Sequence, residues 1–236
     1  MIDLSIIIPA YNEAERILPT LHSCYQWLSA SPYHFEIIVV DDGSTDHTLS
    51  LLETLQHASM PELSVLSLHP NKGKGNAVRI GMLAAKGAFR LFSDADGSTP
   101  VHELDKMLQP LREGQVDITI GSRYAAGSVV LKTQPPLRVF WSRLANRIVQ
   151  RVLLPGIADP HCGFKAFTAD AAAAVFPRCR VDGWSFDLEV LAIARRQGLR
   201  IKETGVQWAN DERSKARIVQ LPLAIADVYR IRKRLR

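Results

Sequence analysis

The sequence predicts an α/β protein with a mainly parallel central sheet and helices on both faces. Apolar, β-branched runs alternate with segments of helical spacing, which is typical of βαβ units. Clusters of polar residues follow several of these runs, as at the carboxyl edge of such sheets. Hydrophobic residues make up 47% of the 236 residues and charged residues 22%, so the chain can bury a full core. We find no linker or internal repeat and expect a single domain over residues 1–236.

The first half of the chain predicts five strands. The apolar run at 4–8 is the first, ended by Pro9, and a helix at 13–28 follows with apolar residues at helical spacing. Ser44 or Asp46 is expected to cap the second helix, and Pro100 to open the fourth. The remaining elements are strands at 35–40, 63–68, 89–92 and 116–120 and helices at 46–55, 75–85 and 100–112.

The pattern loosens after Gly121. Residues 124–136 are rich in Gly, Ser, Ala and Pro and are predicted to form a mobile loop. The expected elements beyond it are helices at 137–153, 170–176, 185–197 and 221–236 and strands at 164–167 and 201–206.

Charge and cysteine content narrow the classes of protein. The net charge of +5 indicates an anionic partner, but aromatic residues are sparse and no recognition motif occurs, so we expect no nucleic-acid binding. Three widely spaced cysteines favour reduced thiols in a cytoplasmic protein. Asp3 stands where a signal peptide needs basic residues, and no run approaches a spanning helix, so membrane association is expected to be peripheral.

The segment LFSDADGSTP carries the strongest chemical signal. If its apolar run is a strand, Asp94 and Asp96 point to the same side at the strand's carboxyl end. Two carboxylates there suit Mg²⁺ or Mn²⁺ that also holds phosphates. Alone, such a pair is more often a solvated turn or a helix cap.

Two further clusters fit a nucleotide. Tyr11 can stack on a base, while Glu13 and Asp42 can accept from a ribose or base; a plain turn with Asn12 as N-cap is the alternative. Lys72 and Lys74, between glycines ahead of a helix, form a phosphate-binding candidate. Neither a P-loop nor a dinucleotide fingerprint is present, which counts against an ATPase and a dehydrogenase. From the residues alone, the prediction is a nucleotide-dependent transferase.

The ordered motifs resemble those of glycosyltransferase family 2. They are SIIIPAYNE, EIIVVDDGSTDHT, NKGKGNAVRIGM, FSDADGSTP and ITIGSRY. The later motifs ADPHCGFKAF and DGWSFDLEVLAIARRQGLRI are similar to those of the polyprenyl-phosphate sugar synthases, most of all the dolichyl-phosphate β-glucosyltransferase branch. The resemblance covers roughly residues 4–217.

This resemblance implies a GT-A fold, the Rossmann-like architecture of nucleotide-diphospho-sugar transferases. It also implies metal-dependent, inverting transfer of a hexose, glucose from a UDP-sugar, to a polyprenyl phosphate. Transfer to a hydroxyl acceptor and a GDP-mannose-using mannose synthase are the alternatives. The sequence does not determine the oligomeric state.

The resemblance also assigns roles to residues. Arg123 meets the acceptor phosphate, and Asp96, Arg123 and Asp187 are the candidate catalytic residues. Ser214 and Lys215 occupy the place of a late basic element over the diphosphate, with Arg213 as a competitor. The expected donor and metal ligands are Pro9, Tyr11, Glu13 and Asp42 for the nucleoside, Lys72 or Lys74 beside it, and Asp94 with Asp96 for metal and diphosphate.

Charge indicates how such a reaction proceeds. An acceptor phosphate is already ionised at neutral pH, so it needs cations to hold it rather than a general base. Asp187 and Glu189 are therefore ambiguous: either can bind sugar hydroxyls or an arginine, and Glu189 can equally be a structural carboxylate on its helix.

Two basic amphipathic helices are candidates for contact with an anionic membrane surface. In the helix at about 137–153, Arg143, Arg147 and Arg151 form one stripe. The helix at about 221–236 carries most of its basic residues in its last seven positions. Ordinary packing of the apolar faces on the protein core is the alternative.

Overall fold

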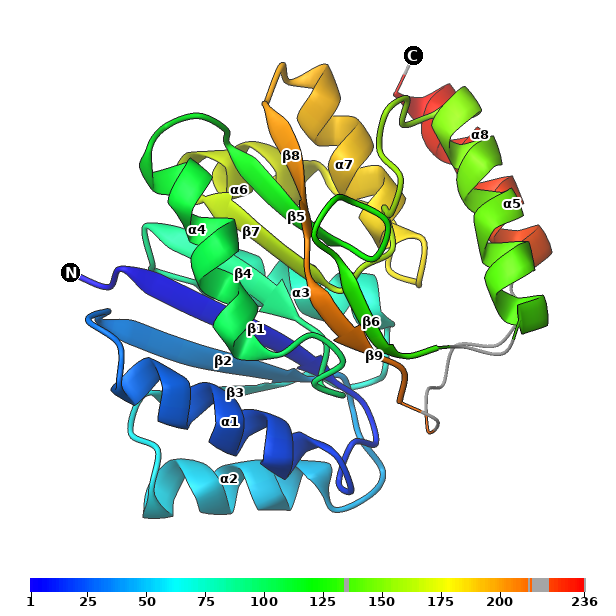
Figure 1. The fold of residues 1–236 in the computed structure, drawn as a ribbon. Helices are drawn as coiled ribbons and strands as arrows, with labels where there is room; N and C mark the ends of the chain where they lie inside the picture. The colour runs from blue at the N-terminus through cyan, green and yellow to red at the C-terminus, as the bar shows by residue number, and fades with distance from the viewer. Residues whose placement is uncertain (134–135, 212, 214–220, 236) are drawn as a thin grey trace.

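The structure, a computed structural model, describes residues 1–133, 136–211, 213 and 221–235, without the side chains of 136–138, 140–141 and 221–225. It has the predicted α/β fold (Figure 1). The main sheet has seven strands in the order β3-β2-β1-β4-β7-β5-β8, and β6 pairs with β9 in a small second sheet. The strands are β1 Leu4–Ala10, β2 Phe35–Asp41, β3 Leu63–Ser67, β4 Phe89–Ser93, β5 Ile118–Ser122, β6 Val129–Lys132, β7 Phe164–Thr168, β8 Ile201–Gly205 and β9 Gln207–Ala209.

The helices fall close to their predicted positions. They are α1 Ile17–Ser29, α2 Thr48–Ala58, α3 Lys74–Ala84, α4 Leu104–Arg112, α5 Pro136–Val152, α6 Ala169–Val175, α7 Phe186–Arg196 and α8 Leu221–Arg234, with short 3-10 turns at Val101–Glu103 and Phe176–Arg178. Helix α2 begins later than predicted, at Thr48, and its N-cap residue is His47, so the prediction of Ser44 or Asp46 as cap is wrong. Asp46 Oδ1 nevertheless accepts from the Thr48 N–H at 2.9 Å. The N-cap position of α1 is Arg16, so the alternative of Asn12 as cap is wrong.

The sheet is mainly parallel, as predicted. Strands β1, β2, β3 and β4 are parallel to one another, and β5 is parallel to β8. Only β7 runs antiparallel, between β4 and β5. The carboxyl ends of β1, β2, β4 and β5 therefore meet at one edge of the sheet.

Strand β1 continues through Pro9 to Ala10, so the prediction that Pro9 ends it is wrong. Pro9 lies in register with Val40, and the Ala10 carbonyl still accepts from the Asp42 N–H at 2.8 Å. A proline this close to the strand end removes one donor without disturbing the later pairing.

Alternation along the strands divides the core into two layers. Ile7, Ile38 and Val40 face the helices α3, α6 and α7. Ile6, Ile8 and Val39 face α1, α2 and α4. Strands buried on both faces are what an α/β fold with two helical layers requires.

The prediction of a loop at 124–136 is wrong for Val129–Lys132, which form β6. This strand pairs in parallel with β9, a second strand that the sequence did not predict. Both strands are short, and their partners are far apart in the sequence, so local pattern carries little sign of them.

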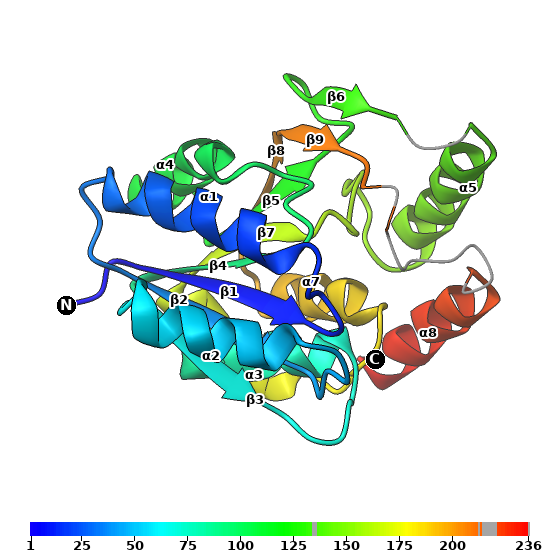
Figure 2. The same ribbon diagram turned by 90° about the horizontal axis from the view of Figure 1, so that it is seen from below.

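Helices α5 and α8 lie side by side, outside the main helical layers (Figures 1 and 2). Part of the apolar side of α8 packs against the protein core, since Val228 and Ile231 are buried beside α7. Arg143, Arg147 and Arg151 of α5 are exposed, as the predicted basic stripe requires. None of the helices, over the residues described, is long and apolar enough to cross a membrane.

Candidate active site at the carboxyl edge of the sheet

Asp94 and Asp96 lie just beyond β4, which ends at Ser93. The expected alternation along a strand therefore does not bring them together. They belong to a tight turn in which Gly97 has φ +64° and its N–H lies 3.4 Å from the Asp94 carbonyl. The Asp96 carboxylate accepts from the Ser98 N–H at 2.9 Å.

The Asp94 carboxylate is held from two sides. Lys74, at the start of α3, forms an ion pair with Asp94 Oδ1. On the other side lies Gly163, where an added Cβ would stand 2.0 Å from Asp94 Oδ2. The Gly163 carbonyl also accepts from the Asp94 N–H at 3.0 Å. Only glycine at 163 leaves room for this carboxylate.

The acidic pair is partly desolvated and lies beside Lys74. Burial, and then the charge of Asp94, raise the pKa of Asp96 above its ordinary value. Burial works against the charge on Lys74, but Asp94 and Asp187 raise its pKa overall. No cluster of three or more His, Cys, Asp or Glu side chains suited to a metal occurs in the described part of the chain. Two carboxylates with no third protein ligand fit a cation that takes its remaining ligands from phosphates and water.

The loop before α3 is anchored by Asp42, which is buried at the end of β2. Its carboxylate accepts from the N–H groups of Lys72 at 3.1 Å and Gly73 at 2.6 Å. Burial raises the pKa of Asp42 despite these bonds. Asp42 thus shapes the lysine loop, a role that the sequence did not indicate.

The same loop is held from the far half of the chain. The Asp182 carbonyl accepts from the Gly75 N–H at 2.7 Å. An added Cβ at Gly73 would lie 2.5 Å from that carbonyl oxygen. Lys72 remains exposed, whereas Lys74 turns inward, 5.2 Å from the centre of the Trp184 ring.

The predicted nucleoside residues of the first motif lie at the end of β1. Pro9 is buried, and Tyr11 is 40% exposed. Glu13 is buried and accepts two bonds of 2.6 Å from Arg16. Its carboxylate is thus shared with a cation that the sequence reading did not assign.

A late segment reaches this end of the sheet. Arg16 Nη1 lies 3.4 Å from Asp211, and Arg213 donates to the same carboxylate at 3.1 Å. The Ala209 N–H donates to the Ser98 carbonyl at 2.9 Å. The tertiary fold therefore brings Arg213 beside the first motif, while Ser214 and Lys215 lie outside the described residues.

Arg123 follows β5 and forms a two-pronged ion pair with Asp159. Its Nε and Nη2 donate to the Asp159 carboxylate at 2.7 Å each, and its N–H donates to it at 2.9 Å. Burial raises the pKa of Asp159, but the bonds and charge of Arg123 outweigh it, so the pKa lies below its ordinary value. The Arg123 guanidinium also lies 5.1 Å from the centre of the Trp208 ring.

Asp187, at the start of α7, is buried against a fully buried lysine. Lys165 Nζ donates to Asp187 Oδ1 at 2.5 Å and to the Cys162 carbonyl at 2.6 Å. Glu189 instead accepts from the N–H groups of Arg180 and Val181 and pairs with Arg234 of α8. Its contacts are those of the structural carboxylate that the sequence left as an alternative.

The site contains residues that the sequence analysis did not assign. Asp159, Gly163 and Lys165 all lie in or beside the motif ADPHCGFKAF, which drew attention only as a resemblance. Lys165 stands in an otherwise apolar strand of this motif, and a buried charge needs a partner. That lysine is the feature of the sequence that could have indicated a buried ion pair. Arg16 could also have been assigned from the sequence. It follows Glu13 by three residues, a spacing at which an acid and a base can pair.

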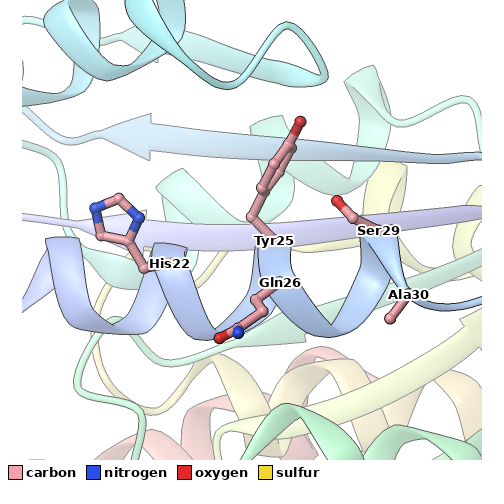
Figure 3. Close-up of a pocket in the computed structure, with 5 residues that line it drawn as sticks. All are labelled: His22, Tyr25, Gln26, Ser29 and Ala30. Atoms are coloured by element: carbon pink, nitrogen blue, oxygen red, sulfur yellow. The ribbon is translucent and has the colours of Figure 1, made fainter.

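A surface depression of about 540 Å³ lies elsewhere, on α1 (Figure 3). Its lining residues are His22, Tyr25, Gln26, Ser29 and Ala30. None of the predicted site residues borders it, so we do not assign it to the reaction.

Comparisons with known proteins agree with this architecture. The dolichyl-phosphate beta-glucosyltransferase of Dictyostelium discoideum is 32% identical over 98% of this chain and 74% of its own length. That of Drosophila melanogaster is 36% identical over 91% and 69%. Glucosyl-3-phosphoglycerate synthase from Mycobacterium tuberculosis, solved with Mn²⁺, UDP and glucosyl-3-phosphoglycerate, superposes with a TM-score of 0.71 at 19% identity, covering 99% of this chain and 80% of that one.

The structural likeness confirms the fold class. The family model "Glycosyl transferase family 2" matches residues 5–176, which include β1, the lysine loop, Asp94, Asp96 and Arg123. On this match and on the relatives that align along almost the whole chain, the protein belongs to glycosyltransferase family 2.

Proposed function

We propose that this protein transfers glucose from UDP-glucose to a polyprenyl phosphate, with inversion at the anomeric carbon. The observation that carries the proposal is the meeting of Asp94, Asp96 and Lys74 at the carboxyl edge, between the Asp42 loop and Arg123. The curated relatives that are named for this reaction align over nearly the whole chain.

The donor side follows from charge. Tyr11, Glu13 and Asp42 stand at the ends of β1 and β2, where a nucleoside binds in α/β sheets. Asp94 and Asp96 would hold a divalent cation, Mg²⁺ or Mn²⁺, which when bound neutralises the leaving diphosphate. Lys74 and Arg213 contribute further positive charge to the same leaving group.

The acceptor side rests on Arg123. Arg123 Nε and Nη2 donate to Asp159, and among the described residues no acceptor of a hydrogen bond from Nη1 is found. Asp159 fixes the guanidinium plane, so Nη1 can meet an acceptor phosphate without reorganisation. Asp187 is held by Lys165 and would orient sugar hydroxyls rather than remove a proton, since the acceptor is already ionised.

Calorimetry with UDP-glucose and Mn²⁺ tests the donor site. Asp96→Ala should weaken metal-dependent binding at least tenfold, the loss of roughly one charged contact. Its thermal unfolding midpoint should stay close to that of the wild type. Asp170→Ala, an exposed acid at the start of α6, is the matched control. Wild-type affinity in Asp96→Ala would contradict the assignment.

Product analysis tests the acceptor and the sugar. The protein should form a β-linked glucosyl product from UDP-glucose and polyprenyl phosphate, and none from the corresponding polyprenol. Product from the alcohol would support a hydroxyl acceptor instead. Product only from GDP-mannose would favour a mannose synthase.

We also propose peripheral contact with the cytoplasmic face of a membrane, whose anionic lipids attract basic surfaces. The exposed stripe Arg143, Arg147 and Arg151 and the exposed Arg230, Arg232 and Lys233 support it. Flotation should show salt-sensitive binding to anionic vesicles and none to neutral ones. Replacing Arg230, Arg232 and Lys233 by glutamine should weaken it, and unchanged flotation would overturn the role of α8.

A further inference from the structure

The Lys74–Asp94 ion pair occupies the place where a cation would be held. Asp94 Oδ1 is buried, and the cation paired with it among the described residues is Lys74. The carboxylate as a whole lies against Gly163, where an added Cβ would stand 2.0 Å from Oδ2 and 2.4 Å from Oδ1. The carboxylate therefore cannot present Oδ1 to a metal ion while the ammonium remains in place.

The backbone under Lys74 is fixed. The Asp42 carboxylate accepts from the N–H groups of Lys72 and Gly73. The Asp182 carbonyl accepts from the N–H group of Gly75. Any release of Asp94 must come from rotation of the Lys74 side chain rather than from movement of the loop. The long, flexible lysine stem permits that rotation.

A bound diphosphate would give the Lys74 ammonium a second negatively charged partner besides Asp94. It carries negative charge beside the same carboxylates, and Lys74 stands at the N-terminus of α3, where anions are favoured. A metal ion arriving alone offers Lys74 no new partner and adds a like charge beside it. With a metal ion and a diphosphate bound together, Asp94 would hold the metal ion, and the diphosphate would be the new acceptor for Lys74.

We propose that Lys74 is the resident counter-ion of Asp94 and makes metal binding depend on the nucleotide diphosphate. This inference rests on the proposed function, because it takes Asp94 as a metal ligand. The inference goes beyond the proposed function because it gives Lys74 a positioning role. Lys74 keeps a metal ion without diphosphate from Asp94 and allows the metal–diphosphate complex to bind. The effect is a positive coupling between the two ligands.

Mn²⁺ binding followed by the electron paramagnetic resonance signal of the free ion tests this without turnover. The wild type should bind Mn²⁺ weakly alone and much more tightly with UDP. Lys74→Met should bind Mn²⁺ alone about tenfold more tightly, since a charged contact no longer competes. UDP should then add much less to the Mn²⁺ affinity of this variant than it adds in the wild type.

Two variants separate direct competition from a general charge effect. Lys86→Met removes the same charge from an exposed side chain just after the end of α3, and should change Mn²⁺ affinity less than twofold, as a screened surface charge does. Lys74→Arg keeps the charge and should retain weak binding of Mn²⁺ alone. Circular dichroism and thermal unfolding establish that each variant is folded.

The outcomes are distinguishable. Equal Mn²⁺ affinity in Lys74→Met and the wild type, with Mn²⁺–UDP still bound, overturns the role of Lys74 and leaves the proposed function standing. An equal gain in Lys86→Met also overturns it, because the effect is then one of net charge. Failure of the wild type to bind Mn²⁺ even with UDP overturns the metal assignment and this inference together.

Discussion

At the scale of single residues, the site is built from ion pairs whose members come from distant parts of the chain. Lys74 meets Asp94, Arg123 meets Asp159, and Lys165 meets Asp187. Each pair is mostly buried, so loss of one member leaves the other as an uncompensated charge. These pairs fix the positions of the side chains at the candidate site and make it sensitive to substitution.

The Arg123–Asp159 pair gives a stability prediction. Asp159→Asn should lower the free energy of unfolding by about 3 kcal/mol at neutral pH, as for breaking a buried pair. Asp117→Asn is the matched control, because Asp117 makes a similar two-pronged pair with Arg200 in an exposed position, and it should cost much less. Urea unfolding measures both, and equal losses would contradict the prediction.

The same pair predicts a pH dependence. The pKa of Asp159 is lower in the folded protein than in the unfolded chain. The stability that the pair contributes is therefore complete above the unfolded value, about 3.9, and is lost as the pH falls through the folded pKa. The difference in the free energy of unfolding between the wild type and Asp159→Asn should be constant from pH 7 to 5. It should become smaller below about pH 4.

Gly163 gives a prediction about the metal site. Gly163→Ala places a methyl group where Asp94 Oδ2 lies, so the carboxylate must move. We expect Mn²⁺–UDP affinity to fall about tenfold or more, as when the support of a metal ligand is lost. Gly183→Ala is the control, since an added Cβ there meets nothing within 4 Å. Calorimetry that finds the two variants equal would contradict this role of Gly163.

At the scale of elements, α8 has two different sides. Val228 and Ile231 are buried in the core, and Arg234 reaches Glu189 of α7. Arg230, Arg232 and Lys233 are exposed. The helix is therefore attached to the protein by its apolar side, and its basic side chains remain exposed.

This division predicts separate effects of two substitutions on α8. Ile231→Ala should lower the free energy of unfolding by about 2–4 kcal/mol, because a buried isoleucine leaves a cavity. Tyr229→Ala, two residues away and 56% exposed, should change it by less than about 0.5 kcal/mol. Denaturant unfolding compares them, and a small effect of Ile231→Ala would mean that α8 is not part of the core.

At the scale of the whole molecule, the family match ends before the fold does. Residues 5–176 hold strands β1 to β7, but α7 and β8 follow them. Helix α7 is buried along Phe186, Leu188, Val190 and Leu191, and β8 pairs along the full length of β5. The later segment is therefore part of the core, and it brings Asp187 against Lys165.

Truncation tests whether the segment after residue 176 is part of the folding unit. A chain of residues 1–176 should show no cooperative unfolding transition, because β5 loses its neighbour β8 and the helical layer of α3, α6 and α7 loses α7. A chain of residues 1–213 keeps the seven-stranded sheet and should fold with lower stability than the full chain. Thermal unfolding followed by circular dichroism distinguishes them. A cooperative transition in the 1–176 chain would contradict the prediction.

Much of the architecture could be predicted from local pattern. Apolar runs and helical spacing placed the main strands and helices within a few residues, because strong periodicity reflects burial directly. Strands β6 and β9 could not be predicted, since they are short and pair across the sequence. The ends of β1 and β4 also differ from expectation, because pairing with neighbours decides where a strand stops.

The sequence by itself determined the α/β class, the family and the acids Asp94 and Asp96 that follow a strand. Only the tertiary structure decided the partners: Lys74 for Asp94, Asp159 for Arg123 and Lys165 for Asp187. Residue spacing records which side chains share an element, and so it reveals periodicity and motifs. It does not record which elements meet, and the charge balance of this site arises where elements meet.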